Sequence, residues 1–174
     1  MQSLPPVNIH EVLQRQYRAS LEMLSHAVTQ CPEALWLAAE RQNRFWHIAY
    51  HAVFFTHLYL QPSEAEFRPW ARHRPNYQFL GTTPWPPYER PTIDAPYSQA
   101  DVLEYRDLCL GEIETRVPAG DLDAPSGFPW LRFSRLEVHL YNIRHLQHHA
   151  AQLIDRLRTG SGIGIGWVGS VPRS

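Results

Sequence analysis

Residues 133–158 read FSRLEVHLYNIRHLQHHAAQLIDRLR, and the apolar residues of this stretch recur at the three- and four-residue steps of an α-helix. On that helix His145 and His149 stand four residues apart and share one face, with Cβ atoms roughly 5–6 Å from each other. His148 points about 100° further round, toward the charged side chains. The two histidines lie at the edge of the apolar face, so they could hold one metal ion together with a third ligand from another element.

A second pair of histidines lies in the stretch 40–60, which we predict to be a helix. Residues 45–60 are apolar nearly all round, which indicates a buried helix, and they fall short of the roughly 18 apolar residues that a membrane span needs. His47 and His51 share one face of this helix, while His57 points about 80° away. From the spacing alone, either His47 or His51 could be the missing third ligand.

Capping residues and helix breakers predict where the other helices begin and end. Three pairs resemble a capping box: Asn8 with Glu11, Ser98 with Asp101, and Ser134 with Glu137. The predicted helices run from Asn8 to before Pro32, from Ser98 to Val117, and from Ser134 to Gly160. With the helix at 40–60 they predict an all-α fold, a four-helix bundle, in which inward side chains of facing helices can build a metal site.

The segments outside these helices differ in composition. Residues 61–97 are rich in proline and aromatic residues, so we expect an ordered long crossover that lies on the bundle and could wall a pocket. Residues 121–129 form a turn-rich connection. Residues 161–174 repeat glycine outside the context of a dinucleotide fold, so we expect a flexible tail that packs Trp167 on a neighbour. The domain prediction is one bundle domain at residues 1–160, followed by this tail.

The composition restricts the classes of partner. The 174 residues suffice for one well-buried domain, and the formal charge of −1 gives no field that would attract nucleic acid or an anionic membrane. All 16 basic residues are arginine, so no lysine can serve as a Schiff-base nucleophile. Two cysteines are too few for a disulfide framework, and the start of the chain lacks the pattern of a signal peptide. These features predict a cytoplasmic protein.

Three imidazoles with one open position form the ligand set of a catalytic zinc-type site, and imidazole also suits nickel, copper and iron. A simpler interpretation is that ten histidines fall at four-residue spacing by chance, each being an ordinary hydrogen-bonded side chain. The zinc-peptidase motif H-E-x-x-H is absent because Leu146 follows the first histidine of the pair. This absence argues against a peptidase.

Three further kinds of side chain are candidates for a role in the site. Glu40, two turns before His47 on the same predicted face, could be a base or an acceptor for a metal ligand, although a favourable charge at a helix start is the simpler interpretation. Tyr141, one turn before His145, could donate a hydrogen bond into a pocket, but core packing explains it as well. Both cysteines lack an adjacent cation that would lower a thiol pKa, so we predict structural roles for them and no protein nucleophile.

Two motifs of the chain resemble those of a known family. The histidine with a small apolar pair in Phe45-Trp46-His47-Ile48-Ala49, and the H-x-x-H-H-x-x-Q pattern from His145 to Gln152, are similar to motifs of the DinB/YfiT-like superfamily of metal-dependent enzymes. The resemblance covers roughly residues 8–158. It implies an up-down-down-up four-helix bundle with a three-histidine site for zinc or nickel, one ligand from the second helix and two from the fourth.

By matching motif, the resemblance assigns the metal ligands to His47, His145 and His149. His51, one turn beyond the usual position of the family, is the reserve ligand or a pocket wall. Characterised relatives include thiol-dependent S-transferases that use bacillithiol, mycothiol or glutathione and a mycothiol-dependent isomerase, and many members are dimers. The resemblance therefore implies a small-molecule substrate, a low-molecular-weight thiol and a homodimer. The crossover and the tail lie outside the shared pattern, so the substrate stays open.

These observations favour a metal-dependent enzyme, with thiol S-transfer as the first hypothesis. The metal would keep a thiolate deprotonated near pH 7 and offer it to an electrophile under the crossover. The same ion with water would give a hydrolase, but no strong base beyond Glu40 and His51 is visible, which slightly favours thiolate attack. The rival from another class is a non-catalytic bundle that binds a small molecule or takes part in a stress response.

Overall fold

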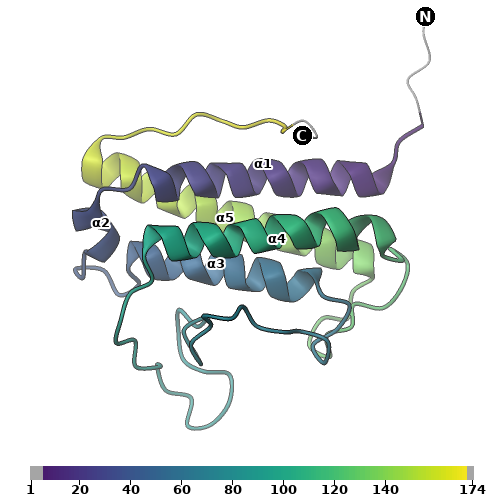
Figure 1. Cartoon of the computed structure of the whole chain (residues 1–174). Coiled ribbons are helices and arrows are strands. Elements are labelled where there is room, and N and C mark those ends of the chain that lie inside the picture. Colours follow the sequence, from purple (N-terminus) through teal and green to yellow (C-terminus); the bar gives the residue numbers. More distant parts are fainter. Residues whose placement is uncertain (1–5, 172–174) are drawn as a thin grey trace, which may run out of the picture.

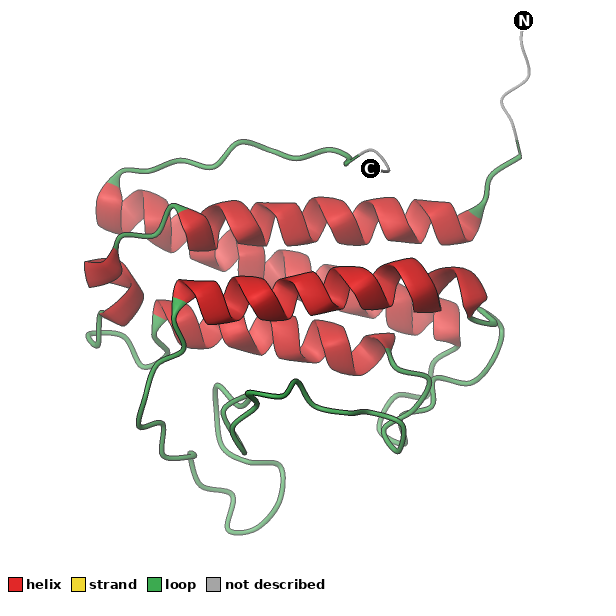
Figure 2. Ribbon diagram, in the orientation of Figure 1, coloured by secondary structure: helices red, strands yellow, loops and turns green. Residues whose placement is uncertain are grey.

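The computed structural model describes residues 6–171, and within them it contains five helices and no β-sheet (Figure 2). The helices are α1 (Ile9–Thr29), α2 (Glu33–Leu37), α3 (Phe45–Leu60), α4 (Gln99–Ala119) and α5 (Arg135–Ser161). The all-helical class predicted from the sequence is therefore confirmed. The first five residues, on which the signal-peptide prediction rests, and the last three of the predicted tail lie outside the described residues.

The four long helices pack side by side as a bundle (Figure 1). α1 packs against α4 and α5, and α3 packs against the same two helices, so α4 and α5 lie at opposite corners. α1 and α5 run in one direction, while α3 and α4 run in the other (Figure 1). The two helices that carry the histidine pairs, α3 and α5, are therefore direct antiparallel neighbours. In the described part of the chain, no helix combines the length and the apolar character required to cross a membrane.

The predicted capping residues begin three of the long helices. The side chains of Asn8, Ser98 and Ser134 accept hydrogen bonds from backbone N–H groups in the first turns of α1, α4 and α5. At α4 the box is complete, because Asp101 also accepts from the Ser98 backbone. α5 continues past Gly160 to Ser161, and its C-cap Gly162 has a φ of 75°, the left-handed conformation that glycine adopts without strain.

The prediction of a helix at residues 40–60 is wrong about where the helix begins, because the observed helix starts later in the chain. α3 begins at Phe45, with Arg44 as the N-cap, and residues 33–37 form the separate short helix α2. Residues 40–44 read ERQNR and contain no apolar side chain that the bundle could bury, so packing does not extend the helix backward. The consequence for function is that Glu40 is not part of α3.

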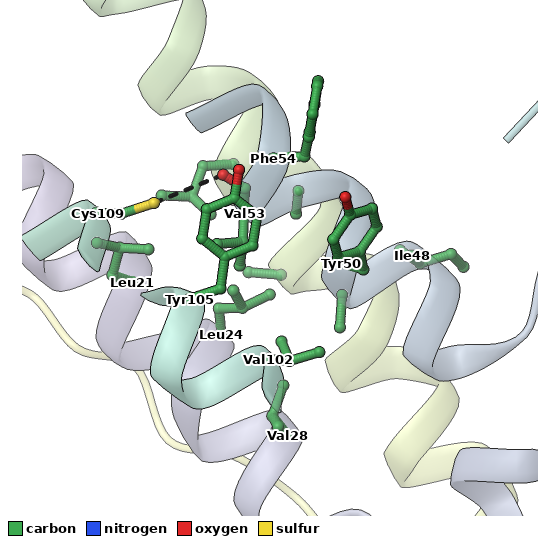
Figure 3. Close-up of a cluster of buried hydrophobic side chains, with 14 of the residues drawn as sticks. Leu21, Leu24, Val28, Ile48, Tyr50, Val53, Phe54, Val102, Tyr105 and Cys109 are labelled. Carbon is green, nitrogen blue, oxygen red and sulfur yellow. Dashed lines mark hydrogen bonds between the residues drawn. The ribbon is translucent and has the colours of Figure 1, made fainter. Parts of the chain in front are cut away.

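The core is centred on α3, whose side chains are buried on nearly every face. Figure 3 shows Tyr50 and Val53 of α3 among side chains of α1 and α4, with Cys109 donating a hydrogen bond to the Val53 carbonyl at 3.6 Å. Cys31 is buried as well, and burial raises the pKa of the Cys31 thiol to about 12 and also raises that of Cys109. Both thiols are protonated near neutral pH and serve as packing groups, as predicted.

The segment between α3 and α4 is attached to the bundle by aromatic stacking. Tyr97 stacks on Tyr50 with ring centroids 4.5 Å apart, and Trp70 stacks on Tyr105 at 4.8 Å. The Tyr97 hydroxyl also donates to the Arg72 carbonyl at 2.7 Å, which ties two parts of the segment together. These contacts hold residues 61–98 against the side of the bundle that carries α3 (Figure 1).

The C-terminal segment runs back along α1 after Gly162 (Figure 1). Ile163, Ile165 and Val168 are half-buried and pack against the core. Trp167, which we expected to pack on a neighbour, is 76% exposed. The aliphatic residues therefore make the buried contacts of this segment, while Trp167 stays largely exposed beside α1 and α5.

Gly127 joins the connection before α5 to the beginning of the crossover. Its φ is 79°, and a Cβ placed there would lie 1.9 Å from the Pro62 carbonyl oxygen. The Gly127 carbonyl accepts a hydrogen bond from the Glu64 N–H at 3.3 Å. Only a residue without a side chain fits this close approach of two backbones.

We expect Gly127→Ala to destabilise the protein by about 2 kcal/mol or more, because it adds both a backbone clash and a strained φ. Gly111→Ala is the matched control, since Gly111 lies in α4 with open space where a Cβ would stand, and alanine favours a helix. Urea unfolding of both variants measures the difference. Equal unfolding midpoints for the two variants would contradict the role of Gly127.

Two buried histidines away from the α3–α5 interface hydrogen-bond to tyrosines. His139 Nδ1 lies 3.0 Å from the Tyr17 hydroxyl, and His57 Nδ1 lies 3.1 Å from the Tyr105 hydroxyl. Burial lowers the pKa of His57 to about 4 and that of His139 to about 3. Both imidazole rings are therefore neutral in the folded protein at pH values above these lowered pKa values.

Stability should fall as the pH drops from about 6.5 to about 4. The unfolded chain binds a proton on each histidine below about 6.5, whereas the folded chain resists protonation down to the lowered pKa values. We expect His57→Gln to remove about 2 kcal/mol of this acid-induced loss, because glutamine does not titrate. Urea unfolding at pH 7.5 and pH 4.5 tests this, and a wild-type stability that is flat over that range would refute it.

Candidate metal centre

Three imidazoles meet at the interface of α3 and α5. His51 of α3 and His145 and His149 of α5 each offer a ring nitrogen, and these nitrogens all lie within 4.8 Å of one another. The Nε2 atoms of His51 and His145 are 3.1 Å apart. Because first-row ions bind imidazole at about 2.0–2.1 Å, two nitrogens on one ion stand about 3.0–3.4 Å apart. The spacing of this pair fits a shared ion.

Hydrogen bonds fix which nitrogen of two of these rings is free. His51 Nδ1 donates to the Gln78 carbonyl at 2.6 Å, and His149 Nδ1 donates to the side-chain oxygen of Gln152 at 3.1 Å. Carbonyl oxygens only accept, so in each neutral ring the proton sits on Nδ1 and Nε2 keeps its lone pair. This outer hydrogen bond is the arrangement that metal-binding histidines have in proteins.

His145 is the ring whose Nδ1 has no hydrogen-bond partner among the described residues, so its proton position follows from its contact with His51. This Nδ1 is buried. Since His51 Nε2 can only accept, the 3.1 Å contact requires His145 to donate from Nε2. His51 and His145 would hold an ion together with His149, and the ion would replace the hydrogen bond between the first two rings. The residues present therefore fit a bound ion.

His47, the first choice from the sequence, is not part of this group. Its Nε2 donates to the Tyr77 carbonyl at 2.7 Å, which places a proton on that nitrogen and removes it as a ligand. His51, the reserve ligand, takes its place because it uses Nδ1 for the neighbouring carbonyl. The group that the structure brings together thus contains His51, the reserve ligand, and not His47, and it contains His145 and His149 at the spacing that the sequence predicted.

A tight turn of the crossover places the backbone carbonyls of Tyr77 and Gln78 against α3. Asn76 has a φ of 69°, a left-handed conformation that asparagine tolerates well. Backbone hydrogen bonds from Tyr77 N–H to the Arg74 carbonyl and from Phe79 N–H to the Asn76 carbonyl close the turn on both sides. Consecutive carbonyls, those of Tyr77 and Gln78, then each hold one histidine of α3.

The environment keeps all three rings neutral. Burial is the main cause that lowers the pKa of His51 well below its usual value, that of His145 to about 3, and that of His149. Repulsion from His149 adds to the effect at the other two rings. The ring of Phe55 covers His51 and His145, with centroid distances of 4.8 and 5.6 Å. Neutral imidazole is the form that binds metal.

The other predicted site residues lie outside the group. Glu40 is exposed in the segment before α3, so its predicted place on the face of His47 is wrong. Tyr141 packs on Tyr59 and Phe133, with ring centroids 5.5 and 5.9 Å apart, which is the core-packing alternative. His148 is exposed, as the helical wheel indicated.

Two glutamines accept hydrogen bonds from the clustered histidines, and the sequence analysis did not name either of them as a site residue. Gln152 lies three residues after His149 on α5, and this spacing places the two side chains on one face, so the sequence contained a usable signal. Gln78 acts through its backbone carbonyl. No side-chain pattern identifies a backbone acceptor, so the sequence contained no signal for it.

The chain was also compared with known proteins. A family model described as the DinB superfamily matches residues 16–153. The chain belongs to the DinB superfamily. The matched range contains α3, all three clustered histidines and Gln152. The comparisons with curated proteins and with solved structures gave no match. The family resemblance seen in the sequence is confirmed, and the three-histidine group of this DinB protein could hold a metal ion.

We expect purified protein to carry close to one divalent ion per chain, measured by plasma mass spectrometry. His51→Ala and the double variant His145→Ala/His149→Ala should lose the ion, because each removes a ligand nitrogen. His47→Ala is the matched control from the same helix and should retain it. If His47→Ala loses the ion and His51→Ala retains it, the third ligand is His47, as the family resemblance implied.

Proposed function

We propose that this chain is a metal-dependent enzyme, built on the up-down-down-up four-helix bundle of the DinB superfamily, and that its reaction is thiol-dependent S-transfer. The observation that carries the proposal is the group of His51, His145 and His149, in which backbone and side-chain acceptors leave two Nε2 lone pairs free. Three imidazoles without a fourth protein ligand are typical of catalytic rather than structural sites.

The roles of the protein groups follow from their contacts. The three histidines would hold a zinc or nickel ion, both of which suit imidazole. When bound, such an ion supplies a Lewis acid that keeps a thiol or a water deprotonated near pH 7. The Gln78 carbonyl and the Gln152 side chain keep the protons of His51 and His149 on Nδ1, and the Phe55 ring shields the group from water.

The positions of the two bases considered from the sequence favour S-transfer over hydrolysis. Among the described residues, the metal-ligating group contains histidines only, without a carboxylate. Glu40 is exposed ahead of α3, and Tyr141 is engaged in aromatic packing. A thiol that is already deprotonated needs no separate base, whereas attack by water is usually assisted by one.

A cationic cavity next to the histidines supports a thiol with carboxylate groups. This cavity of about 320 Å³ is lined by Arg44, Arg90 and His47. His47 lies one turn before His51 on α3, so the cavity lies beside the histidine group. Among the described residues, neither arginine has an acidic side chain within 4 Å, so both guanidinium groups can pair with an anion from solution. Glutathione carries two carboxylates that would suit them. The proposed setting is the cytoplasm, where such thiols stay reduced.

Turnover assays with bacillithiol, mycothiol, glutathione and coenzyme A and a haloarene electrophile test the proposal. We expect metal-dependent turnover with at least one thiol, reduced by about 100-fold or more in His145→Ala because the ion is lost. If glutathione is used, Arg44→Ala should raise KM by about 3- to 10-fold with little change in kcat. Arg15→Ala, a surface arginine of α1, is the control.

The alternatives give different results in the same assay. Thiol-independent hydrolysis of activated esters by the metal-loaded protein would assign it to the metal-dependent hydrolases. No turnover with any thiol or ester, with the ion present, would favour a non-catalytic small-molecule-binding bundle.

A further inference from the structure

A second, larger cavity lies beside the three-histidine group. Its volume of about 650 Å³ is in the usual range of small-molecule sites, and it is lined by side chains of α3, of the crossover and of the connection before α5. Phe55 belongs to its wall and also packs on His51, with ring centroids 4.8 Å apart. The cavity therefore begins where the histidine group ends.

Most of the cavity wall is aromatic. Phe79 and Trp85 meet edge to face with ring centroids 5.1 Å apart, and Phe54 meets Phe67 in the same way at 5.3 Å. Trp85 and Trp130 are 47% and 50% exposed. Large aromatic side chains left exposed around a concave surface favour an apolar ligand of ring size that covers them.

The polar side chains of the wall are mainly N–H donors. The Trp85 indole N–H has no acceptor among the described residues, and the Trp130 indole N–H lies next to the Tyr59 hydroxyl. The side-chain oxygen of Gln78 is buried beneath the wall, so of this amide only the nitrogen can meet a ligand. Glu64 contributes an exposed carboxylate, which disfavours an anionic ligand.

His73 is the donor of the wall whose proton position follows from a protein contact. Its Nδ1 lies 2.7 Å from the Tyr50 hydroxyl. Burial raises the pKa of Tyr50 and lowers that of His73, so both groups are neutral near pH 7. Because an imidazole nitrogen is a better acceptor than a phenol oxygen, the hydroxyl donates to Nδ1. The one ring proton of neutral His73 is then on Nε2.

The Nε2–H group of His73 is accessible to a ligand. His73 is half-buried and lines the cavity, with its ring centroid 5.2 Å from that of Phe54 in the same wall. Among the described residues nothing accepts a hydrogen bond from Nε2, yet this nitrogen is not one of the polar atoms that are buried without a partner. It therefore keeps accessible surface, unlike the side-chain oxygen of Gln78.

We propose that this cavity binds an uncharged aromatic molecule with a carbonyl or nitro group, one oxygen of which accepts a hydrogen bond from His73 Nε2–H. As a binding site, the assignment depends on the cavity and its donors alone. As the site of the electrophile, it rests on the proposed function, because a carbonyl or nitro group is also what makes a nearby carbon of the ligand electrophilic toward a thiolate.

Equilibrium dialysis of the full-length protein against two naphthalenes tests the binding step without requiring activity. The first probe, 2-acetylnaphthalene, carries the acceptor oxygen, and the second, 2-isopropenylnaphthalene, has nearly the same shape with a CH₂ group in its place. His73→Asn keeps an acceptor for the Tyr50 hydroxyl but is too short to present a donor at the position of Nε2. We expect it to weaken 2-acetylnaphthalene about 5-fold more than 2-isopropenylnaphthalene. His26→Asn, the same substitution on α1 outside the cavity wall, should change neither probe.

Two tryptophan variants test the location. Trp130→Ala should weaken both probes because it removes part of the wall, and Trp167→Ala should change neither, since Trp167 lines a different groove beside α1 and α5. Thermal unfolding of each variant establishes that it is folded. The proposal is overturned if the wild type binds neither probe, if His73→Asn leaves the preference between the probes unchanged, or if Trp130→Ala leaves both affinities unchanged.

The outcomes separate this proposal from the proposed function. Binding with the expected pattern, but without turnover with any thiol, would support the cavity and count against S-transfer alone. Turnover of nitro-substituted haloarenes that is unchanged in His73→Asn and in Trp130→Ala would support the enzyme and overturn the assignment of its electrophile to this cavity.

Discussion

The hydrogen bond from His51 Nδ1 to the Gln78 carbonyl is the contact on which the candidate centre depends. It decides the tautomer of His51 and so decides that its Nε2 lone pair faces His145. The same bond holds the crossover against α3 next to Phe79, which lines both the cavity of about 320 Å³ beside His47 and a cavity of about 650 Å³ beside Phe55. A single contact therefore couples the three-histidine group of the bundle to the walls of two cavities.

The features that depend on local periodicity could be predicted from the sequence. The spacing of His145 and His149 on α5, and the apolar character of α3, follow from the helical repeat, and the structure places both as expected. The capping residues Ser98 and Ser134 also act locally, within one turn of the helices that they begin. Each of these predictions required only residues a few positions apart, and the family resemblance rests on the same local motifs.

The choice between His47 and His51 could not be predicted in this way. The two residues lie one turn apart on the same face of α3, so a helical wheel does not distinguish them. What distinguishes them are backbone carbonyls 30 and 27 residues away, which bind Nε2 of His47 and Nδ1 of His51. The predicted placement of Glu40 on α3 was wrong for a related reason. Where α3 begins depends on tertiary packing, which the helical periodicity of the sequence does not reveal.

The division between bundle and crossover separates the three-histidine group from the side chains that line the cavity of about 650 Å³ beside Phe55 and Trp85. The histidines are held by a backbone carbonyl at Gln78 and by a side chain within α5, so their arrangement does not depend on the side chains of the crossover that line the larger cavity. Substitutions at Phe79 or Trp85 can change the shape of that cavity while the carbonyl stays in place. The arrangement of the three histidines and the shape of the neighbouring cavity can thus vary independently, although the same short turn of chain contributes to both.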